Sequence, residues 1–526
     1  ILFLPFILLL VFIRKIVVNK SEIKFNIIKL VAFVLVYLIF IGALFINSDG
    51  INSAKDLYFN VSNNELNIRK FGVLNAFRID VKRSIFGFDV SVNIPNNYVD
   101  GNEKEENIPE EPEIVYEYNN MDIDFDNLIA NETNGTVKMM HEYFNNESGT
   151  LQNEYTKYFE GKNLILFMAE SFNEIAVRED ITPTLYKLTN NGFVFNNYYV
   201  PYFLSTIGGE FQADTALYPN INSLSIWRSG NNSFPYGLGN SFNNINYNTY
   251  AYHNHSGYFQ DRYKYLKAIG FNNFKACAMG LDINCDVWPE SDIEMIEKTY
   301  TDYIDSDKPF MAYYMTVSGH MEYNFFGNNI ASKNKSLVDN LNLSTSASAY
   351  LATQIELDRA LELLINKLEE ANKLDDTVII LTADHYPYAL SLEEMNELST
   401  FKRDNLFEIN HNSLIIWNNK LNRVEIDKVG MSIDALPTVY NLFGIEYDSR
   451  LFAGTDLLSN SDGLVILSNR SWITDKGKYN SITNEYIGIG DVDYVNNINK
   501  TIQNKISFSR SMITNNGYKY IKIKEK

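Results

Sequence analysis

The sequence predicts an α/β fold in which a doubly wound, mainly parallel sheet follows N-terminal transmembrane helices. Two observations support this prediction. After residue 162, short apolar runs alternate with longer amphipathic stretches, which is typical of parallel strands joined by crossover helices. The first 47 residues differ in composition from the rest and contain two apolar runs. A chain of 526 residues with 45% hydrophobic content is also long enough to bury a large core.

The two apolar runs occupy residues 1–13 and 27–46, and the second approaches the ~20 residues needed to cross a bilayer. The loop between them is basic and contains Arg14, Lys15, Lys20 and Lys24. The positive-inside rule places such a loop in the cytoplasm, so that everything after residue 46 is extracellular. A signal peptide is the alternative, but two runs around a basic loop favour a multi-pass anchor in the cell membrane. The opening Ile1 leaves room for a truncated first helix.

Changes in composition divide the chain into four expected regions. These are a transmembrane region of two helices (1–47), a juxtamembrane and acidic linker region (48–161), a main α/β domain (162–460) and a C-terminal strand-and-loop region (461–526). Within the linker, the acidic stretch 101–113 contains two prolines, and such a composition is typical of a solvated spacer.

Hydrophobic periodicity locates the elements of the α/β domain. Short apolar runs predict strands at 164–168, 249–252, 310–317, 378–382 and 413–417. Amphipathic stretches predict helices at 182–190, 258–269, 347–372 and 433–443. The alternation of the two kinds indicates crossover connections on both faces of a sheet.

Charge and cysteine content exclude some classes of function. The net charge of -20 argues against nucleic acid as a partner, because phosphate neutralisation needs clustered basic residues. The two cysteines, Cys277 and Cys285, are too few for a disulfide framework and lack the C-x-x-C spacing of a zinc site. We expect two ordinary thiols, with one local bridge as the alternative.

Polar residues suited to chemistry follow four of the predicted strands. They are Glu170, His253, His320 and the pair Asp384 and His385. Taken singly, each is better explained as a helix cap or a solvated loop residue. In an open α/β sheet, however, the ligand lies at the carboxyl ends of the strands, where these residues meet. Mixed oxygen and nitrogen ligands suit a divalent ion of the manganese, magnesium or zinc type.

A hydroxyl pair, Ser205 and Thr206, lies where a loop opens onto a helix. The positive end of a helix dipole and a bound metal ion would both favour an alkoxide there, so either residue is a candidate nucleophile. The alternative is an N-cap without any role in catalysis.

At these residues the sequence resembles the lipoteichoic acid synthase family, membrane-bound phosphoglycerol transferases of the sulfatase and alkaline phosphatase superfamily. The similarity spans residues 118–456. Its landmarks are the segments 162–165, 169–172, 182–185, 205–210, 382–385, 434–438 and 442–444.

The resemblance implies roles for particular residues. Glu170, Thr206, Asp384 and His385 would hold one divalent ion, usually manganese in the family, with magnesium or zinc as alternatives, and Thr206 would be the nucleophile. The residues implied to bind the phosphoglycerol group are His253, Arg262 and His411, with His320 as a second-tier candidate.

Two departures from the family pattern concern the same site. The stretch 258–261 lacks the tryptophan that the family carries beside the arginine, and the nucleophile loop reads Ile207-Gly208-Gly209 where the family is more polar.

The function implied by the resemblance is transfer of glycerophosphate from phosphatidylglycerol, through a threonine-bound intermediate, to a glycolipid or growing polymer. The region 162–460 would then be a sulfatase-like catalytic domain beside the membrane. The alternatives are a phosphoethanolamine transferase, a phosphodiesterase, a sulfatase, and a non-catalytic binding protein tethered to the membrane. A sulfatase requires a cysteine or serine in a C/S-x-P/A-x-R context, and neither cysteine has one.

Overall fold

The computed structural model describes residues 52–59, 63–86, 115–219 and 230–522, together with isolated positions at 31, 35, 39, 42 and 46. The chain forms two compact units, Ile1–Val81 and Lys82–Lys526. The apolar runs 1–13 and 27–46 fall almost entirely outside the described residues, and so does the acidic stretch 101–113. Within the described part of the chain, no helix combines the length and the apolar character needed to cross a membrane.

The first unit is helical where it is described. It contains α3 (Ala54–Phe59), α4 (Asn64–Phe71) and most of α5 (Val73–Phe86). The side chain of Asn63 caps α4 by accepting a hydrogen bond from the backbone N–H of Leu66 at 3.0 Å. A small apolar cluster that includes Leu57 and Phe71 holds these helices together.

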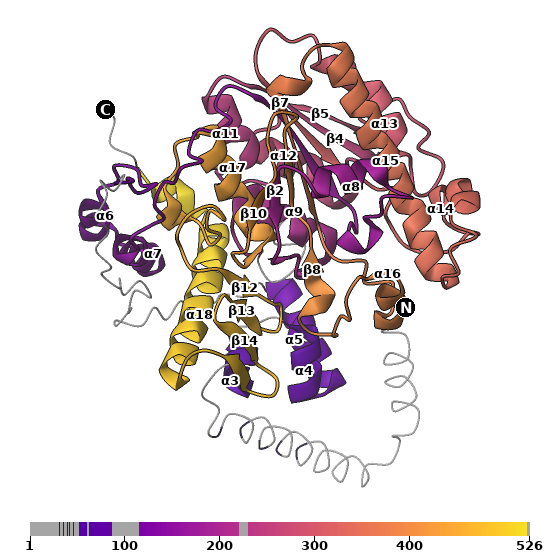
Figure 1. Ribbon diagram of the computed structural model, residues 1–526. Coiled ribbons are helices and arrows are strands. Elements are labelled where there is room, and N and C mark those ends of the chain that lie inside the picture. Colours follow the sequence, from indigo (N-terminus) through magenta and orange to yellow (C-terminus); the bar gives the residue numbers. More distant parts are fainter. Residues whose placement is uncertain are drawn as a thin grey trace, which may run out of the picture. The chain divides into compact units, whose positions relative to one another are not determined.

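The second unit is built around an eight-stranded sheet with the order β10-β2-β9-β7-β1-β6-β4-β5 (Figure 1). All neighbouring strands are parallel except at β9, which runs antiparallel to both β2 and β7. The strands are β1 (Asn163–Ala169), β2 (Phe193–Phe195), β4 (Asn248–Ser256), β5 (Asn273–Cys277), β6 (Phe310–Met315), β7 (Thr377–Ala383), β9 (Ile415–Trp417) and β10 (Val424–Ile426). The predicted α/β fold with a mainly parallel sheet is therefore confirmed.

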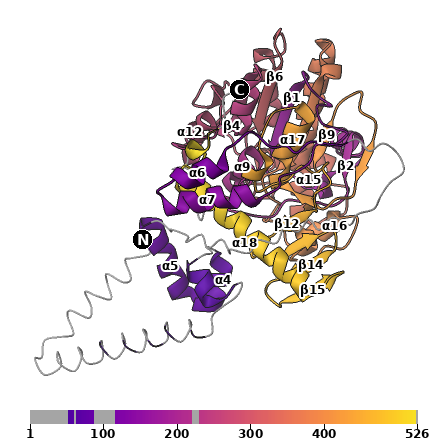
Figure 2. The ribbon, with the colours of Figure 1, turned by 90° about the vertical axis from the view of Figure 1, so that its left-hand side faces the viewer.

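Helices cover both faces of this sheet (Figures 1 and 2). One layer contains α8 (Pro183–Thr189), α13 (Asp292–Thr299), α14 (Asn329–Asn334), α15 (Thr345–Glu370) and α16 (Leu392–Leu398). The other contains α9 (Ser205–Thr215), α11 (Leu238–Asn244), α12 (Arg262–Ala268) and α17 (Ala435–Phe443). The four helices expected from the sequence correspond to α8, α12, α15 and α17.

The three central strands explain why the sheet is a good scaffold for a site. Every residue of β1, β6 and β7 is buried, which is the pattern of parallel strands covered on both faces. Leu164 and Ile165 of β1 are fully inaccessible, and burying a side chain of this kind contributes about 2 kcal/mol. Residues at the carboxyl ends of these strands are therefore held on a rigid frame.

Several elements lie in regions that the sequence assigned to linkers and loops. The helices α6 (Phe125–Asn131) and α7 (Gly135–Asn146) belong to the expected linker, yet Phe125 and Phe144 are buried in the main core. The expected strand-and-loop region does contain the sheet β12 (Leu464–Ile466), β13 (Trp472–Thr474), β14 (Gly477–Asn480) and β15 (Glu485–Gly488). It also contains a long helix, α18 (Val492–Thr514), which lies beside α7 (Figure 2). Phe508 of α18 stacks on Tyr143 of α7.

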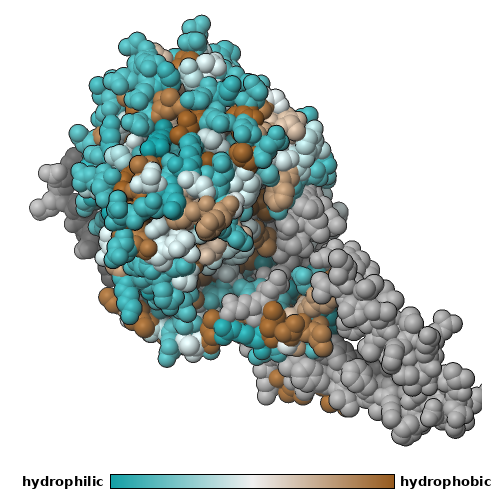
Figure 3. Space-filling view, turned by 90° about the vertical axis from the view of Figure 1, so that its right-hand side faces the viewer, coloured by the Kyte–Doolittle hydropathy of each residue, from teal (hydrophilic) through white to brown (hydrophobic). Residues whose placement is uncertain are grey.

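A three-stranded sheet completes the unit, with the order β11-β3-β8. Its strands are β3 (Tyr198–Tyr199), β8 (His411–Asn412) and β11 (Gly430–Met431). The face of the molecule in Figure 3 is largely hydrophilic, with hydrophobic side chains scattered in small groups, as expected for a surface in contact with water.

The expectation of two ordinary thiols was wrong. Cys277 and Cys285 form a disulfide whose Cα atoms lie 6.0 Å apart. Cys277 ends β5, and the chain turns back through Ala278 and Gly280, both of which have a positive φ. The segment that follows brings Cys285 back to the end of β5. The spacing of eight residues between the two cysteines did not by itself reveal this turn.

We predict that thiol titration of the unfolded, unreduced protein detects no free thiol. Replacing both cysteines by serine should lower the free energy of unfolding by about 2 kcal/mol, because the closed loop is short. Chemical denaturation of the two proteins measures the difference. Two reactive thiols per chain in the unreduced sample would contradict the disulfide.

Candidate active site

The pairing of β1 with β7 brings two carboxylates side by side. Ala169 is in register with Ala383, so the next residues along the two parallel strands, Glu170 and Asp384, leave the sheet at the same level. Both side chains are buried. The backbone N–H of Ser171 donates to Oδ1 of Asp384 at 2.9 Å, and the backbone N–H of Glu170 donates to the hydroxyl of Thr316 at 3.0 Å.

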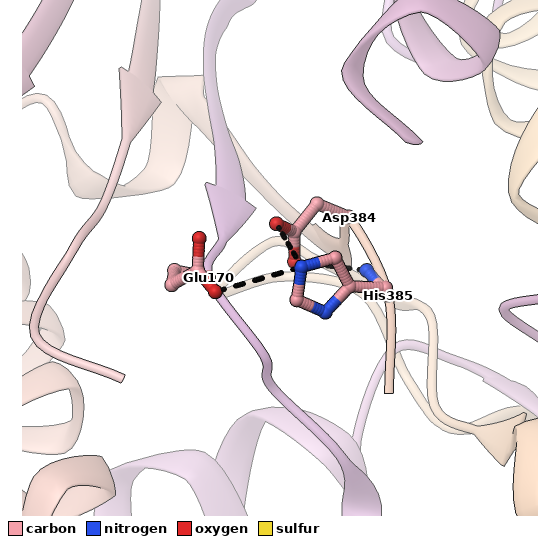
Figure 4. A group of neighbouring side chains, drawn as sticks. All are labelled: Glu170, Asp384 and His385. Carbon is pink, nitrogen blue, oxygen red and sulfur yellow. Dashed lines mark hydrogen bonds and ion pairs between the residues drawn. The ribbon is translucent and has the colours of Figure 1, made fainter. Parts of the chain in front are cut away.

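His385, the residue after Asp384, is the third member of this group (Figure 4). Its Nε2 lies 3.2 Å from Oδ2 of Asp384 and 3.6 Å from Oε1 of Glu170. Its Nδ1 lies 3.0 Å from the carbonyl oxygen of Tyr386, which can only accept a hydrogen bond. A proton on Nδ1 therefore leaves the lone pair of Nε2 directed between the two carboxylates, as a metal ligand requires.

Thr206 adds a hydroxyl to the same group. Its Oγ1 donates to Oε2 of Glu170 at 3.2 Å and lies 3.3 Å from Nε2 of His385. Thr206 is the second residue of α9, so its hydroxyl lies at the positive end of the helix dipole. The structure thus brings together Glu170, Thr206, Asp384 and His385.

The start of α9 is held in an uncommon backbone conformation. Leu204 and Ser205 have φ of 55° and 62°, and two successive left-handed residues with side chains cost about 1–2 kcal/mol each. Two glycines show what fixes this geometry. A Cβ on Gly208 would lie 1.7 Å from the carbonyl oxygen of Phe203, and one on Gly209 would lie 1.9 Å from that of Asp384. The glycines that depart from the family pattern therefore let α9 pack directly on the Asp384 backbone.

The electrostatics of the group favour a bound cation. Burial, together with the neighbouring Glu170 carboxylate, raises the pKa of Asp384 to about 7. Oδ2 of Asp384 is buried and has no hydrogen-bond partner among the described residues. A divalent ion would relieve both the repulsion and the unmet acceptor, and two carboxylates with one imidazole are suitable ligands. The residues present therefore fit a metal ion.

Next to this group, a buried ion pair involves Arg262. Its Nη2 and Nε donate to the two carboxylate oxygens of Glu210 at 2.6 and 3.2 Å, so its fork is engaged within the protein. Its Nη1 lies 2.6 Å from Nε2 of His253, whose Nδ1 lies 3.0 Å from the carbonyl oxygen of Met315. Burial and the Arg262 cation lower the pKa of His253 well below its ordinary value, which makes the ring neutral.

Arg262 and His253 thus hold each other in place. Glu210 lies one helical turn after Thr206 on α9, so the same ion pair ties α9 to β4 and to the start of α12. Two N–H groups of the Arg262 guanidinium, one on Nη1 and one on Nη2, have no recorded hydrogen bond among the described residues.

The loop after β6 contributes His320, and a tryptophan packs against it. The rings of His320 and Trp288 lie 4.7 Å apart, and the rings of Trp288 and His255 lie 5.0 Å apart. Nδ1 of His255 lies 2.8 Å from Oε1 of the buried Glu290. Sequence reasoning did not identify His255, Trp288 or Glu290. The one available signal was that His255 follows His253 by two residues, and so lies on the same side of β4.

His411 is placed differently from the other predicted site residues. Its Nδ1 lies 2.7 Å from Oε1 of Glu174, and its Nε2 lies 3.1 Å from the carbonyl oxygen of Asn196. The ring packs against Tyr199 and Phe401. With both ring nitrogens engaged, His411 connects β8 to the loop after β2. Within the described part of the chain, no contact is recorded between its side chain and Glu170, Thr206, Asp384 or His385.

We predict that Mn²⁺ raises the thermal midpoint of the protein through this group. An ion present at a hundredfold excess over its Kd stabilises the folded state by about 2.7 kcal/mol. For a chain of this size the shift is about 3 °C. Asp384→Asn should abolish the shift, and differential scanning fluorimetry measures it. Asp282→Asn, which alters a carboxylate that is 98% exposed, should keep it. An unchanged shift in Asp384→Asn would place the ion elsewhere.

We further predict that Gly209→Ala lowers both stability and metal affinity. The added methyl group meets the Asp384 backbone, and overpacking of this kind costs about 1–3 kcal/mol. Gly135→Ala is the matched control, because a Cβ there meets nothing within 4 Å. Denaturant midpoints and Mn²⁺ titrations compare the two variants. Equal behaviour of both would show that the close approach of α9 is not needed.

Comparisons with known proteins agree with this geometry. The chain is 25% identical over 362 residues to lipoteichoic acid synthase 1 of Bacillus subtilis (strain 168), which covers 63% of this chain and 53% of that protein. It is 23% identical over 403 residues to lipoteichoic acid synthase of Staphylococcus aureus (strain USA300), covering 70% of this chain and 59% of that protein. The chain thus spans about half the length of the curated relatives that it matches.

Two solved structures have the same fold. The lipoteichoic acid synthase LtaP from Listeria monocytogenes gives a TM-score of 0.60 at 22% identity, covering 72% of this chain and 98% of LtaP. A protein of the alkaline phosphatase superfamily from Vibrio parahaemolyticus gives a TM-score of 0.55 at 17% identity, covering 74% of this chain and 97% of that one.

These likenesses confirm the resemblance that the sequence motifs indicated. The sequence model of the sulfatase family matches residues 162–445, from just before β1 to just after α17. Because this match covers more than half of the 526 residues, the chain belongs to the sulfatase family.

Proposed function

We propose that the protein is a metal-dependent phosphoglycerol transferase that takes glycerophosphate from phosphatidylglycerol through a covalent intermediate on Thr206. The observation that carries the proposal is the contact of the Thr206 hydroxyl with both Glu170 and His385, at 3.2 and 3.3 Å. The similarity to lipoteichoic acid synthases supports this substrate class over other esters.

The chain's own residues account for the first displacement. Glu170 accepts the hydrogen bond of the Thr206 hydroxyl and so orients Oγ1, while the helix dipole of α9 favours negative charge on that oxygen. The two remaining N–H groups of Arg262 and the ring of His320 are suited to hold the phosphate oxygens. When bound, a divalent ion, with manganese as our first choice, supplies charge stabilisation to those oxygens and acidifies the hydroxyl.

Thr206 attacks phosphorus, the bond to the lipid oxygen breaks, and diacylglycerol leaves. An acceptor hydroxyl then displaces Thr206 and takes the glycerophosphate. A glycolipid or a growing polymer as acceptor would give a teichoic-type chain, whereas water would make the enzyme a phosphodiesterase. Phosphoethanolamine transfer uses the same group, and the donor headgroup distinguishes the two reactions.

Sulfatase activity is less well supported, although the fold is that of the family. The hydroxyl in the metal group belongs to a threonine, and both cysteines of the chain are joined in a disulfide. A non-catalytic role is also less well supported, because the complete group of two carboxylates, one imidazole and one hydroxyl is present.

We propose that residues 1–47 anchor the protein in the cell membrane, with the catalytic domain outside the cell. The support is the pair of apolar runs around a basic loop. A tether beside the bilayer raises the effective concentration of a lipid headgroup at the site. The proposed membrane anchor therefore fits the proposed lipid substrate.

We predict that Thr206→Ala lowers diacylglycerol release by at least about three orders of magnitude, because it removes the nucleophile. The assay uses the full chain with Mn²⁺ and phosphatidylglycerol labelled in its headgroup, in detergent micelles. Thr206→Ser should retain measurable release, and Ser205→Ala tests the neighbouring hydroxyl. Full activity of Thr206→Ala would refute the covalent scheme. Release from phosphatidylethanolamine alone would keep the nucleophile and change the donor.

A further inference from the structure

His255 and Glu290 form a pair that the function above does not use. Glu290 is 2% exposed, and its Oε1 lies 2.8 Å from Nδ1 of His255, whose side chain is 33% exposed. The second oxygen of Glu290, Oε2, is buried without a hydrogen-bond partner among the described residues. A buried carboxylate with a single partner depends on that partner for compensation of its charge. His255 is thus oriented by a carboxylate on one side and open to solvent on the other.

The other histidines near the site are arranged differently. Both ring nitrogens of His253 are engaged, one by Arg262 and one by a backbone carbonyl. His320 has its Nδ1 against the backbone carbonyl of Met321 at 2.7 Å. Only His255 combines a carboxylate on Nδ1 with an Nε2 for which no hydrogen bond is recorded among the described residues. That combination is the arrangement of a proton-transfer group, because the carboxylate stabilises the ring when it carries a second proton.

His255 lies on the same edge of the sheet as the group formed by Glu170, Asp384 and His385. It lies at the carboxyl end of β4, which pairs with β6, and β6 pairs with β1, the strand that leads into Glu170. Trp288 bridges the gap, since its ring is 5.0 Å from His255 and 4.7 Å from His320. His320 in turn lies near enough to Asp384 and His385 for their charges to act on it. The carboxyl ends of β4, β6 and β1 therefore lie at the same edge of the sheet.

Resting on the proposed function, we propose that His255, oriented by Glu290, is the general acid and base of the transfer. In the first step Oγ1 of Thr206 bonds to phosphorus and loses its proton to water. The bond from phosphorus to the lipid oxygen breaks, and that oxygen takes the proton from Nε2 of His255. In the second step Nε2 takes the proton of the acceptor hydroxyl, whose oxygen bonds to phosphorus. The bond to Thr206 breaks, and Oγ1 recovers a proton from water.

The same group serves both steps because the geometry of displacement requires it. The leaving oxygen departs opposite to Thr206, and the acceptor must enter along the path that it vacated. One imidazole on that side alternates between the two protonation states and ends each cycle as it began. Trp288 has a different role in this scheme. Its exposed ring lies beside His255 and forms an aromatic wall that the polyol or lipid end of the substrate can contact.

The test exploits a leaving group that needs no proton. Wild type and His255→Gln are assayed with Mn²⁺ on phosphatidylglycerol and on the 4-nitrophenyl phosphodiester of glycerol. On the lipid, His255→Gln should lower diacylglycerol release by about 100-fold or more. On the nitrophenyl ester it should keep the initial burst of one nitrophenolate per enzyme and lower the later turnover by a similar factor. Mass spectrometry should then find glycerophosphate accumulated on the Thr206 peptide.

Two further variants separate this role from a structural one. Glu290→Gln keeps a hydrogen bond but not the charge, and should show the same pattern with a smaller loss. Asp282→Asn should match wild type on both substrates. Loss of the nitrophenolate burst together with the lipid activity, or no loss on the lipid, would overturn the role of His255 while leaving Thr206 as the nucleophile. A wild-type enzyme that forms neither product nor adduct from either ester would overturn the proposed function and this inference together.

Discussion

The candidate site depends on the register between β1 and β7. Because Ala169 pairs with Ala383, the two strands deliver Glu170 and Asp384 to one place as buried, like-charged neighbours. Burial, together with the repulsion between these two carboxylates, raises the pKa of Asp384. The surrounding core, with its fully buried strands, supplies the stability that holds them together. A cation would compensate the charge of these two carboxylates. His385 and Thr206 lie beside them and add a nitrogen and a hydroxyl oxygen to the same group.

The second requirement is the close approach of α9. Gly208 and Gly209 allow its first turn to touch the backbone at Phe203 and Asp384, and no side chain larger than hydrogen fits there. The salt bridge between Glu210 and Arg262 then fixes the helix from its next turn. The hydroxyl of Thr206 is thus positioned by backbone packing on one side and by a buried ion pair on the other.

Part of the candidate site and most of the fold of the α/β domain could be predicted from the sequence. Glu170, Asp384 and His385 follow buried strands, and parallel strands end at one edge, so their meeting was predictable. Thr206 required the family motif, because a hydroxyl at a helix start is equally a cap. The fold of the α/β domain followed from periodicity, but α18 was missed because the apolar residues along it are separated by many Asn and Ser residues.

The remaining differences have long-range causes. His411 lies against Glu174 and Asn196, contacts that depend on chain segments more than 200 residues away. Glu290 and Trp288 reach His255 from a segment 33 to 35 residues further along the chain, a fold-back that local patterns do not encode.

The disulfide has a consequence for where the protein can mature. Cys277 and Cys285 close the chain only three residues before Trp288, so the bond anchors the segment that carries the aromatic wall and Glu290. Disulfides form and persist in oxidising compartments and are reduced in the cytosol. A copy retained inside the cell would have the metal group but a loosely held wall. The role proposed for His255 would then depend on oxidation of the two cysteines.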